Sequence, residues 1–95
     1  MVDAKVLRPD SVVQLSPFYL LRWEETQNAY VLLYPEGVVK LNGTSGEIMR
    51  LVTESATVQD IVDQLTTKYA DQSIAPDILE FLEVSHANSW IRVKP

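Results

Sequence analysis

Cysteine is missing from all 95 residues of this chain. Its absence excludes disulfide bonds, thiolate nucleophiles and cysteine-ligated zinc sites together. Long apolar runs are missing too: none approaches the roughly 18 residues that a membrane span needs. No apolar region of a signal peptide follows the N-terminal residues Met1 to Lys5. We therefore expect a cytoplasmic protein with no membrane partner.

Positive charge is in short supply. Eight Lys and Arg residues stand against 13 Asp and Glu residues, which leaves a net charge of -5. Proteins bind phosphate backbones mostly through Lys and Arg, so this balance argues against a nucleic-acid partner. The composition, with 46% hydrophobic and 22% charged residues, is that of a globular domain long enough to bury a core.

The sequence offers no recognisable catalytic set. His86 is the only histidine, and a lone histidine on a helix is more often a surface residue than a ligand. Ser11 and Ser45 have no histidine near them in the sequence, and no G-x-S-x-G motif occurs. Residues 43–46 lack the spacing and the lysine of a phosphate-binding loop. We expect no catalytic residue and no metal site, hence a binding module and not an enzyme.

The most informative stretch is residues 31–42, in which two apolar runs flank a Pro-Glu-Gly corner at residues 35–37. Val, Leu and Tyr favour strands, while the proline and glycine suit the second and last positions of a turn. Residues 18–24 and 29–34 form an earlier predicted hairpin around a polar break. Because sequential strands usually pair, the sequence predicts a three-stranded antiparallel meander.

Three helices are predicted after the third strand. Thr44, with Glu47 three residues on, fits a capping box at the start of the first helix. Thr57 is the predicted N-cap of the second helix, with Asp60 in its first turn. Pro76 suits the first turn of the third helix. Strands followed by helices favour an α+β fold with the helices on one face of the sheet.

The ends of the chain have weaker patterns. Residues 1–16 are predicted to form an extended N-terminal arm, anchored by Val12, Val13 and Leu15, and residues 17–95 a single domain. The last residues, from Trp90 to Lys94, are predicted to form either a short strand or an extended tail.

The third helix has two partly apolar faces. One face carries Ile74, Ile78, Phe81, Leu82 and Ser85, and the other carries Leu79, Glu83, His86 and Trp90. Such a helix can contact the core with one face and line a groove with the other. The alternative interpretation is a helix buried on both faces.

The third strand, Val38 to Leu41, can lie at the edge of the sheet, where free N–H and C=O groups can accept another strand. Val39 and Leu41 are predicted to face the core, and Val38 and Lys40 to face outward. The alternative interpretation is an ordinary edge that Lys40 protects from further pairing.

The motifs VLLYPEG at residues 31–37, VKLN at 39–42 and GEI at 46–48 resemble the family of the pyrroloquinoline quinone (PQQ) biosynthesis protein D, PqqD. FLE at residues 81–83, HA at 86–87 and WI at 90–91 extend the similarity, which covers about Arg8 to Arg92.

The resemblance implies a winged-helix-like peptide chaperone in PQQ biosynthesis. Such a domain binds the ribosomally made precursor peptide PqqA by strand addition and presents it to PqqE, a radical S-adenosylmethionine enzyme. It implies no cofactor: no iron–sulfur cluster and no bound quinone. The implied peptide-binding residues are an edge and a groove wall, made of Val38, Val39, Lys40 and Leu41 and of Leu79, Leu82, Glu83 and His86.

One alternative function and one structural question stay open. A winged-helix nucleic-acid-binding regulator is the alternative, because a fold does not determine a function. An exposed strand edge is compatible with a monomer or with a dimer.

Overall fold

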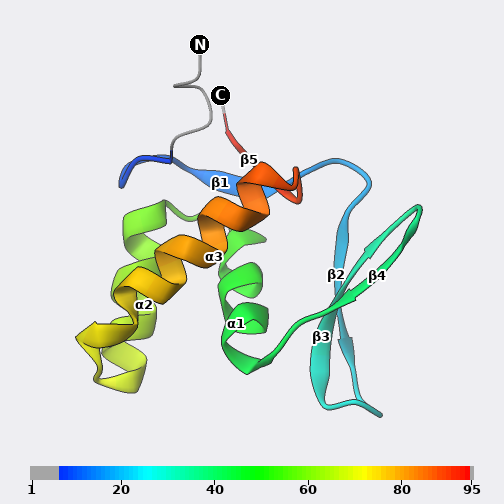
Figure 1. Cartoon of the computed structure of the whole chain (residues 1–95), viewed down its shortest axis with the longest axis horizontal. Helices are drawn as coiled ribbons and strands as arrows, with labels where there is room; N and C mark the ends of the chain where they lie inside the picture. The colour runs from blue at the N-terminus through cyan, green and yellow to red at the C-terminus, as the bar shows by residue number, and fades with distance from the viewer. Residues whose placement is uncertain (1–6, 95) are drawn as a thin grey trace.

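The computed structural model describes residues 7–94. Its elements are, in order, β1 (Val13–Leu15), β2 (Leu20–Glu24), β3 (Ala29–Tyr34), β4 (Gly37–Lys40), α1 (Gly43–Val52), α2 (Val58–Tyr69), the short 3₁₀ helix η2 (Gln72–Ile74), α3 (Ala75–Ala87) and β5 (Ile91–Val93). Figure 1 shows the three helices together on one side and the hairpins β2 to β4 on the other. The α+β prediction is confirmed.

Strands β2, β3 and β4 form a three-stranded antiparallel sheet in sequence order, which confirms the predicted meander. The short last strand also exists. It is β5, and it pairs antiparallel with β1, with Val13 opposite Val93 and Leu15 opposite Ile91. The final residues of the predicted arm therefore lie in a second, two-stranded sheet, while residues 1–6 lie outside the described part.

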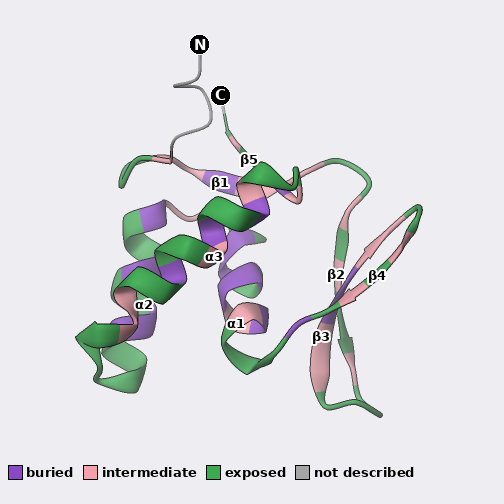
Figure 2. Ribbon diagram, viewed as in Figure 1, coloured by how far each residue is buried: buried purple, intermediate pink, exposed green. Residues whose placement is uncertain are grey.

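The core joins the helices to both sheets. Figure 2 shows the buried residues along the facing sides of α1, α2 and α3. The spacing of apolar residues at positions 58, 61, 62, 65 and 69 predicts one buried stripe on α2. Val58, Ile61, Val62 and Leu65 are buried as predicted, whereas Tyr69 is 45% exposed. Fully buried side chains elsewhere include Val13, Leu32, Ile48, Met49, Val52, Ile78, Leu82 and Ile91.

Helix α1 begins earlier than the sequence predicted. Its N-cap is Asn42, whose Oδ1 accepts a hydrogen bond from the N–H of Ser45 at 2.8 Å. The predicted capping box of Thr44 and Glu47 is therefore wrong, because Asn42, two residues after the end of β4, already caps the first turn of α1. The other two starts are confirmed, with Thr57 as the N-cap of α2 and Pro76 in the first turn of α3.

Helix α1 lies unusually close to β3 at Gly46. A Cβ atom on this buried glycine would lie 2.9 Å from Cδ2 and 3.2 Å from Cβ of Tyr30. The Tyr30 ring is itself held edge-on by Trp23, at a centroid distance of 5.1 Å. The absence of a side chain at Gly46 thus sets the distance between helix and sheet.

Candidate functional site

Within the described residues, β4 is an edge strand that pairs only with β3. The N–H of Leu41 donates to the carbonyl of Tyr30 at 3.1 Å, which makes these two residues a hydrogen-bonded pair. Such pairs alternate along an antiparallel ladder, so Val39 also directs its N–H and C=O toward β3. Val38 and Lys40, by the same alternation, direct theirs away from the sheet. The edge is open to a further strand.

The side chains of β4 alternate in the same way. Val38 is 58% exposed and Lys40 is exposed, whereas Val39 is half-buried and Leu41 is only 3% exposed. The predicted facing of all four residues is confirmed. Leu41 belongs to the core, so its side chain can only support the edge from beneath.

Of the four residues predicted on α3, Leu79, Glu83 and His86 share one flank, and Leu82 lies apart from them. Leu82 is fully buried in the core. Leu79 and Glu83 line a cavity between α3, α2 and the segment at Pro9. Glu83 also lines a second cavity with His86, next to Arg92 of β5. These cavities include no residue of β4, so Leu79, Glu83 and His86 lie on the flank of α3 that faces the N-terminal segment and β5.

The opposite flank of α3 faces the end of β4, and we call Asp77, Phe81 and Val84 the α3 flank. Their i, i+4, i+7 spacing places them on one side of the helix. Phe81 is half-buried and Val84 is 46% exposed. Asp77 and Phe81 share a cavity of about 610 Å³ with residues 42, 44 and 45, which lie just beyond the end of β4 at Lys40.

Sequence reasoning missed this flank, although one signal was available. Phe81 was assigned to the core face of the third helix, and Val84 to neither face. An apolar residue three positions after an aromatic one, outside the core stripe, indicates a third apolar surface on the helix.

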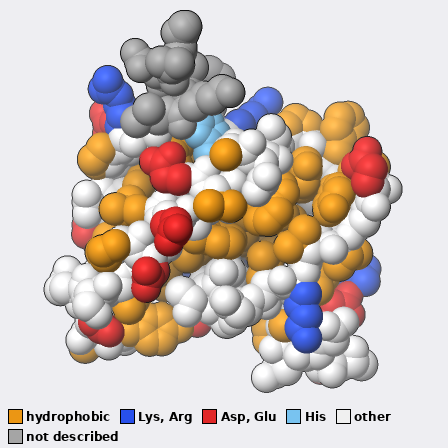
Figure 3. Space-filling view, in the orientation of Figure 1, with side chains coloured by type: hydrophobic (Ala, Val, Ile, Leu, Met, Phe, Trp, Pro, Cys, Tyr) orange, Lys and Arg blue, Asp and Glu red, His pale blue; other side chains and the backbone are white. Residues whose placement is uncertain are grey.

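The β4 edge and the α3 flank belong to one surface. Figure 3 shows hydrophobic side chains gathered from α3 across to the sheet on this face of the molecule. Main-chain groups of β4 and apolar side chains of α3 are the two components that strand addition uses, one for affinity and the other for specificity. The arrangement can therefore hold an extended peptide segment.

One ionised cluster lies beside this surface. Oε2 of Glu47 in α1 accepts hydrogen bonds from the hydroxyl of Tyr69 at 2.8 Å and from Nζ of Lys68 at 3.0 Å. Burial raises the pKa of Glu47, but these hydrogen bonds and the charges of Lys68 and Arg50 outweigh it, so the pKa lies below the ordinary 4.5. The hydrogen bond to Glu47 raises the pKa of Tyr69. The cluster ties the end of α2 to α1.

Replacing Tyr69 by phenylalanine should raise the pKa of Glu47 toward its ordinary value. Because the folded pKa is lowered, ionised Glu47 stabilises the fold above about pH 4.5, and this contribution is lost as the pH falls through the folded pKa. Without the hydroxyl donor only the folded pKa rises, so the contribution of Glu47 to stability should be smaller and should be completely lost at a higher pH. A carboxyl-carbon NMR titration measures the shift, and Asp71, whose pKa Ser73 lowers, is the internal control. An unchanged Glu47 titration would contradict the assigned cause.

The described residues hold neither a metal-binding cluster nor a membrane-spanning helix. No group of three or more His, Asp or Glu side chains among residues 7–94 is arranged to bind a metal ion. In the same range, no helix is both long and apolar enough to cross a membrane.

Known proteins resemble this chain in sequence and fold. Residues 29–91 match the family model described as coenzyme PQQ synthesis protein D (PqqD). A PqqA binding protein of Methylococcus capsulatus is 44% identical over 86 residues, which cover 90% of this chain and 92% of that protein. A PqqA binding protein of Acinetobacter baylyi is 32% identical and covers 96% of this chain and 97% of its own length.

A solved structure shows the same fold. It is the solution NMR structure of the PqqD truncation of Methylobacterium extorquens PqqCD, which represents a functional, stand-alone recognition element for ribosomally synthesised and modified peptides. It has a TM-score of 0.76 and 26% identity, and the match covers 96% of this chain and 99% of that one.

Proposed function

From the membership of this chain in the PqqD family, we propose that it is a peptide-binding protein of PQQ biosynthesis whose ligand is the precursor peptide PqqA. The peptide binds as a strand added to β4, against the α3 flank. The domain performs no chemistry on the peptide.

The observation that carries this proposal is the open edge of β4 beside the α3 flank, which carries the apolar side chains of Phe81 and Val84. Val38 and Lys40 present main-chain donors and acceptors to the outside, as the pair formed by Leu41 and Tyr30 requires. An added strand satisfies these groups, and its alternate side chains reach the α3 flank. Leu41 and Leu82 act beneath this surface, while Leu79, Glu83 and His86 lie outside the proposed groove.

The proposal includes delivery to a second protein. A peptide held along one edge keeps its remaining residues exposed, so the radical S-adenosylmethionine enzyme PqqE can reach them while the domain is bound. This step takes place in the cytoplasm, where a ribosomally made peptide is released. The complex can form with a monomer, and a dimer through the same edge would compete with the peptide.

Calorimetric titration with the synthetic PqqA precursor tests binding, with a scrambled peptide of identical composition as the control. We expect saturable one-to-one heat from the native order only. Delivery is tested by measuring PqqE-dependent modification of PqqA with and without the domain. Equal heat from both peptides would contradict sequence-specific binding, and equal modification rates would contradict delivery.

The nucleic-acid alternative gains no support from the third helix. Helix α3 carries Asp77, Glu80 and Glu83 but neither Lys nor Arg, and the chain has a net charge of -5. Binding to nucleic acid would weaken steeply with added salt. Measuring any affinity for DNA at two salt concentrations would separate the two functions.

A further inference from the structure

We propose that the cavity at the end of β4 is a specificity pocket that takes a lysine or arginine side chain of the bound peptide. This inference rests on the proposed strand addition and goes beyond it, because it assigns a chemical class to one residue of the ligand. The cavity has a volume of about 610 Å³. Three features of the cavity indicate which side chain it takes: where it lies relative to β4, the apolar residues of its floor and the charge of its rim.

The cavity lies just beyond the end of β4. Asn42 lines the cavity and lies two residues beyond Lys40, the last residue of β4. A strand advances about 3.3 Å per residue, so a peptide paired along β4 reaches the level of the cavity about two residues after passing Lys40. One peptide side chain near that point can enter it.

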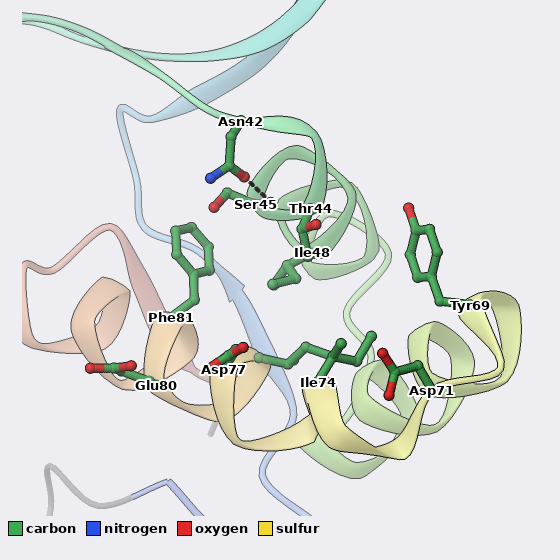
Figure 4. A pocket seen from close by; sticks show the side chains of 11 residues that line it. Asn42, Thr44, Ser45, Ile48, Tyr69, Asp71, Ile74, Asp77, Glu80 and Phe81 are labelled. Carbon is green, nitrogen blue, oxygen red and sulfur yellow. Dashed lines mark hydrogen bonds between the residues drawn. The ribbon is translucent and has the colours of Figure 1, made fainter.

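The floor of the cavity is apolar. Figure 4 shows Ile48 of α1, Phe81 of α3 and Ile74 of η2 around the hollow, where Ile78 also contributes to the lining. Ile78 is fully buried, so this floor is part of the rigid core. It suits the methylene stem of a long side chain, since Lys and Arg bury such stems along apolar surface while the charged end stays near water.

The rim of the cavity is acidic. Asp71, Asp77 and Glu80 line it, with the Glu80 side chain turned away from the hollow in Figure 4, and none of its lining residues is Lys or Arg. Figure 4 shows Asp71 and Asp77 on the side of η2 and α3, across from Thr44 of α1. Hydrogen bonds from the hydroxyl and N–H of Ser73 hold the pKa of Asp71 below its ordinary value, which keeps that carboxylate charged. The nearby cation Lys68 is bound to Glu47.

Two other roles for these groups compete with this inference. Asp71 caps η2, and Asp77 lies in the first turn of α3, where an anion is favourable in any case. Glu80 has neither role. The positive ends of α1 and α3 also lie at the cavity, each equivalent to roughly half a charge, and that of α1 is capped by Asn42. The carboxylates of Asp71 and Asp77 together outweigh them. The charge complementarity therefore favours a cationic side chain.

The test neutralises the rim and keeps its shape. The triple variant Asp71→Asn, Asp77→Asn and Glu80→Gln retains every acceptor oxygen that the local caps use. A matched triple, Asp10→Asn, Glu25→Gln and Asp63→Asn, removes the same charge from residues outside this cavity. Calorimetry with the PqqA precursor should give a dissociation constant about tenfold higher for the rim variant and less than twofold higher for the matched triple.

A second arm identifies the peptide residue. Each Lys and Arg of the precursor is replaced in turn by norleucine, which keeps the stem and removes the charge. One replacement should weaken binding to the wild-type domain and leave binding to the rim variant unchanged, as expected for two groups in contact.

The outcomes separate this inference from the proposed function. If both triples bind like the wild type while Val38→Pro, which removes an outward N–H of the β4 edge, still weakens binding, the pocket assignment is overturned and strand addition stands. If no norleucine replacement is coupled to the rim, the assignment to a basic side chain is overturned. If the wild-type domain binds no precursor at all, the proposed function fails first. Circular dichroism confirms that each variant is folded.

Discussion

Replacing Val38 by proline should weaken binding of the precursor peptide about tenfold to hundredfold and leave the domain folded. Proline removes the outward N–H of Val38 and so leaves one peptide carbonyl without a donor, which costs about 1–3 kcal/mol. The fold tolerates the change because that N–H makes no bond within the sheet, as the alternation from the Leu41–Tyr30 pair shows. Calorimetry with the precursor measures the loss.

Two neighbouring substitutions serve as controls. Val38→Thr keeps the N–H and nearly the same side-chain shape, so the peptide should bind within a few-fold of the wild-type affinity. Val39→Pro removes an N–H that faces Leu32 of β3 and should destabilise the sheet itself. Wild-type affinity in the folded Val38→Pro variant would show that the peptide does not dock on this edge.

Replacing Gly46 by alanine should destabilise the domain by about 1–3 kcal/mol, the usual cost of overpacking a core. The added methyl group would lie 2.9 Å from the Tyr30 ring and 3.2 Å from its Cβ atom. Since the second contact is close to the backbone of β3, the ring cannot relieve it by rotation alone, and α1 must move away from the sheet. Urea unfolding followed by circular dichroism measures the change.

Gly43 provides the matched control for this change. It lies in the same helix, and a Cβ atom there would have no neighbour within 4 Å. Gly43→Ala should therefore be neutral or stabilise the domain by up to about 1 kcal/mol, because alanine restricts the unfolded chain more than glycine does. Equal destabilisation by both substitutions would mean that a helix effect, and not the contact with Tyr30, sets the cost.

Much of the fold could be predicted from local patterns. The turn at residues 35–37 and the apolar stripe of α2 are properties of neighbouring residues. The turn formed as predicted, and so did the stripe except at its last residue, Tyr69. The start of α1 could not be predicted from neighbouring residues alone. Asn42 and Thr44 are both good N-caps, and the end of β4 at Lys40 decides between them by placing Asn42 at the first turn.

Only the β4 part of the candidate site could be predicted from the sequence, and the α3 part could not. The facing of Val38 and Lys40 follows from alternation in a strand and needs no knowledge of the rest of the molecule. The rotation of α3 about its axis is different, because contacts with α1, α2 and β5 determine it. Apolar residues occur all around this helix, so periodicity alone could not tell the flank of Phe81 from the flank of Leu79.

The pairing of β1 with β5 has a consequence for protein engineering. Val13 and Val93 are direct partners in an antiparallel pair, so the described chain enters and leaves the domain at one place. Figure 1 shows this place beside the helices, with the hairpin of β3 and β4 on another side. The domain can therefore be inserted as a cassette into a surface loop of a host protein, or circularly permuted through a short linker, with the β4 edge still accessible.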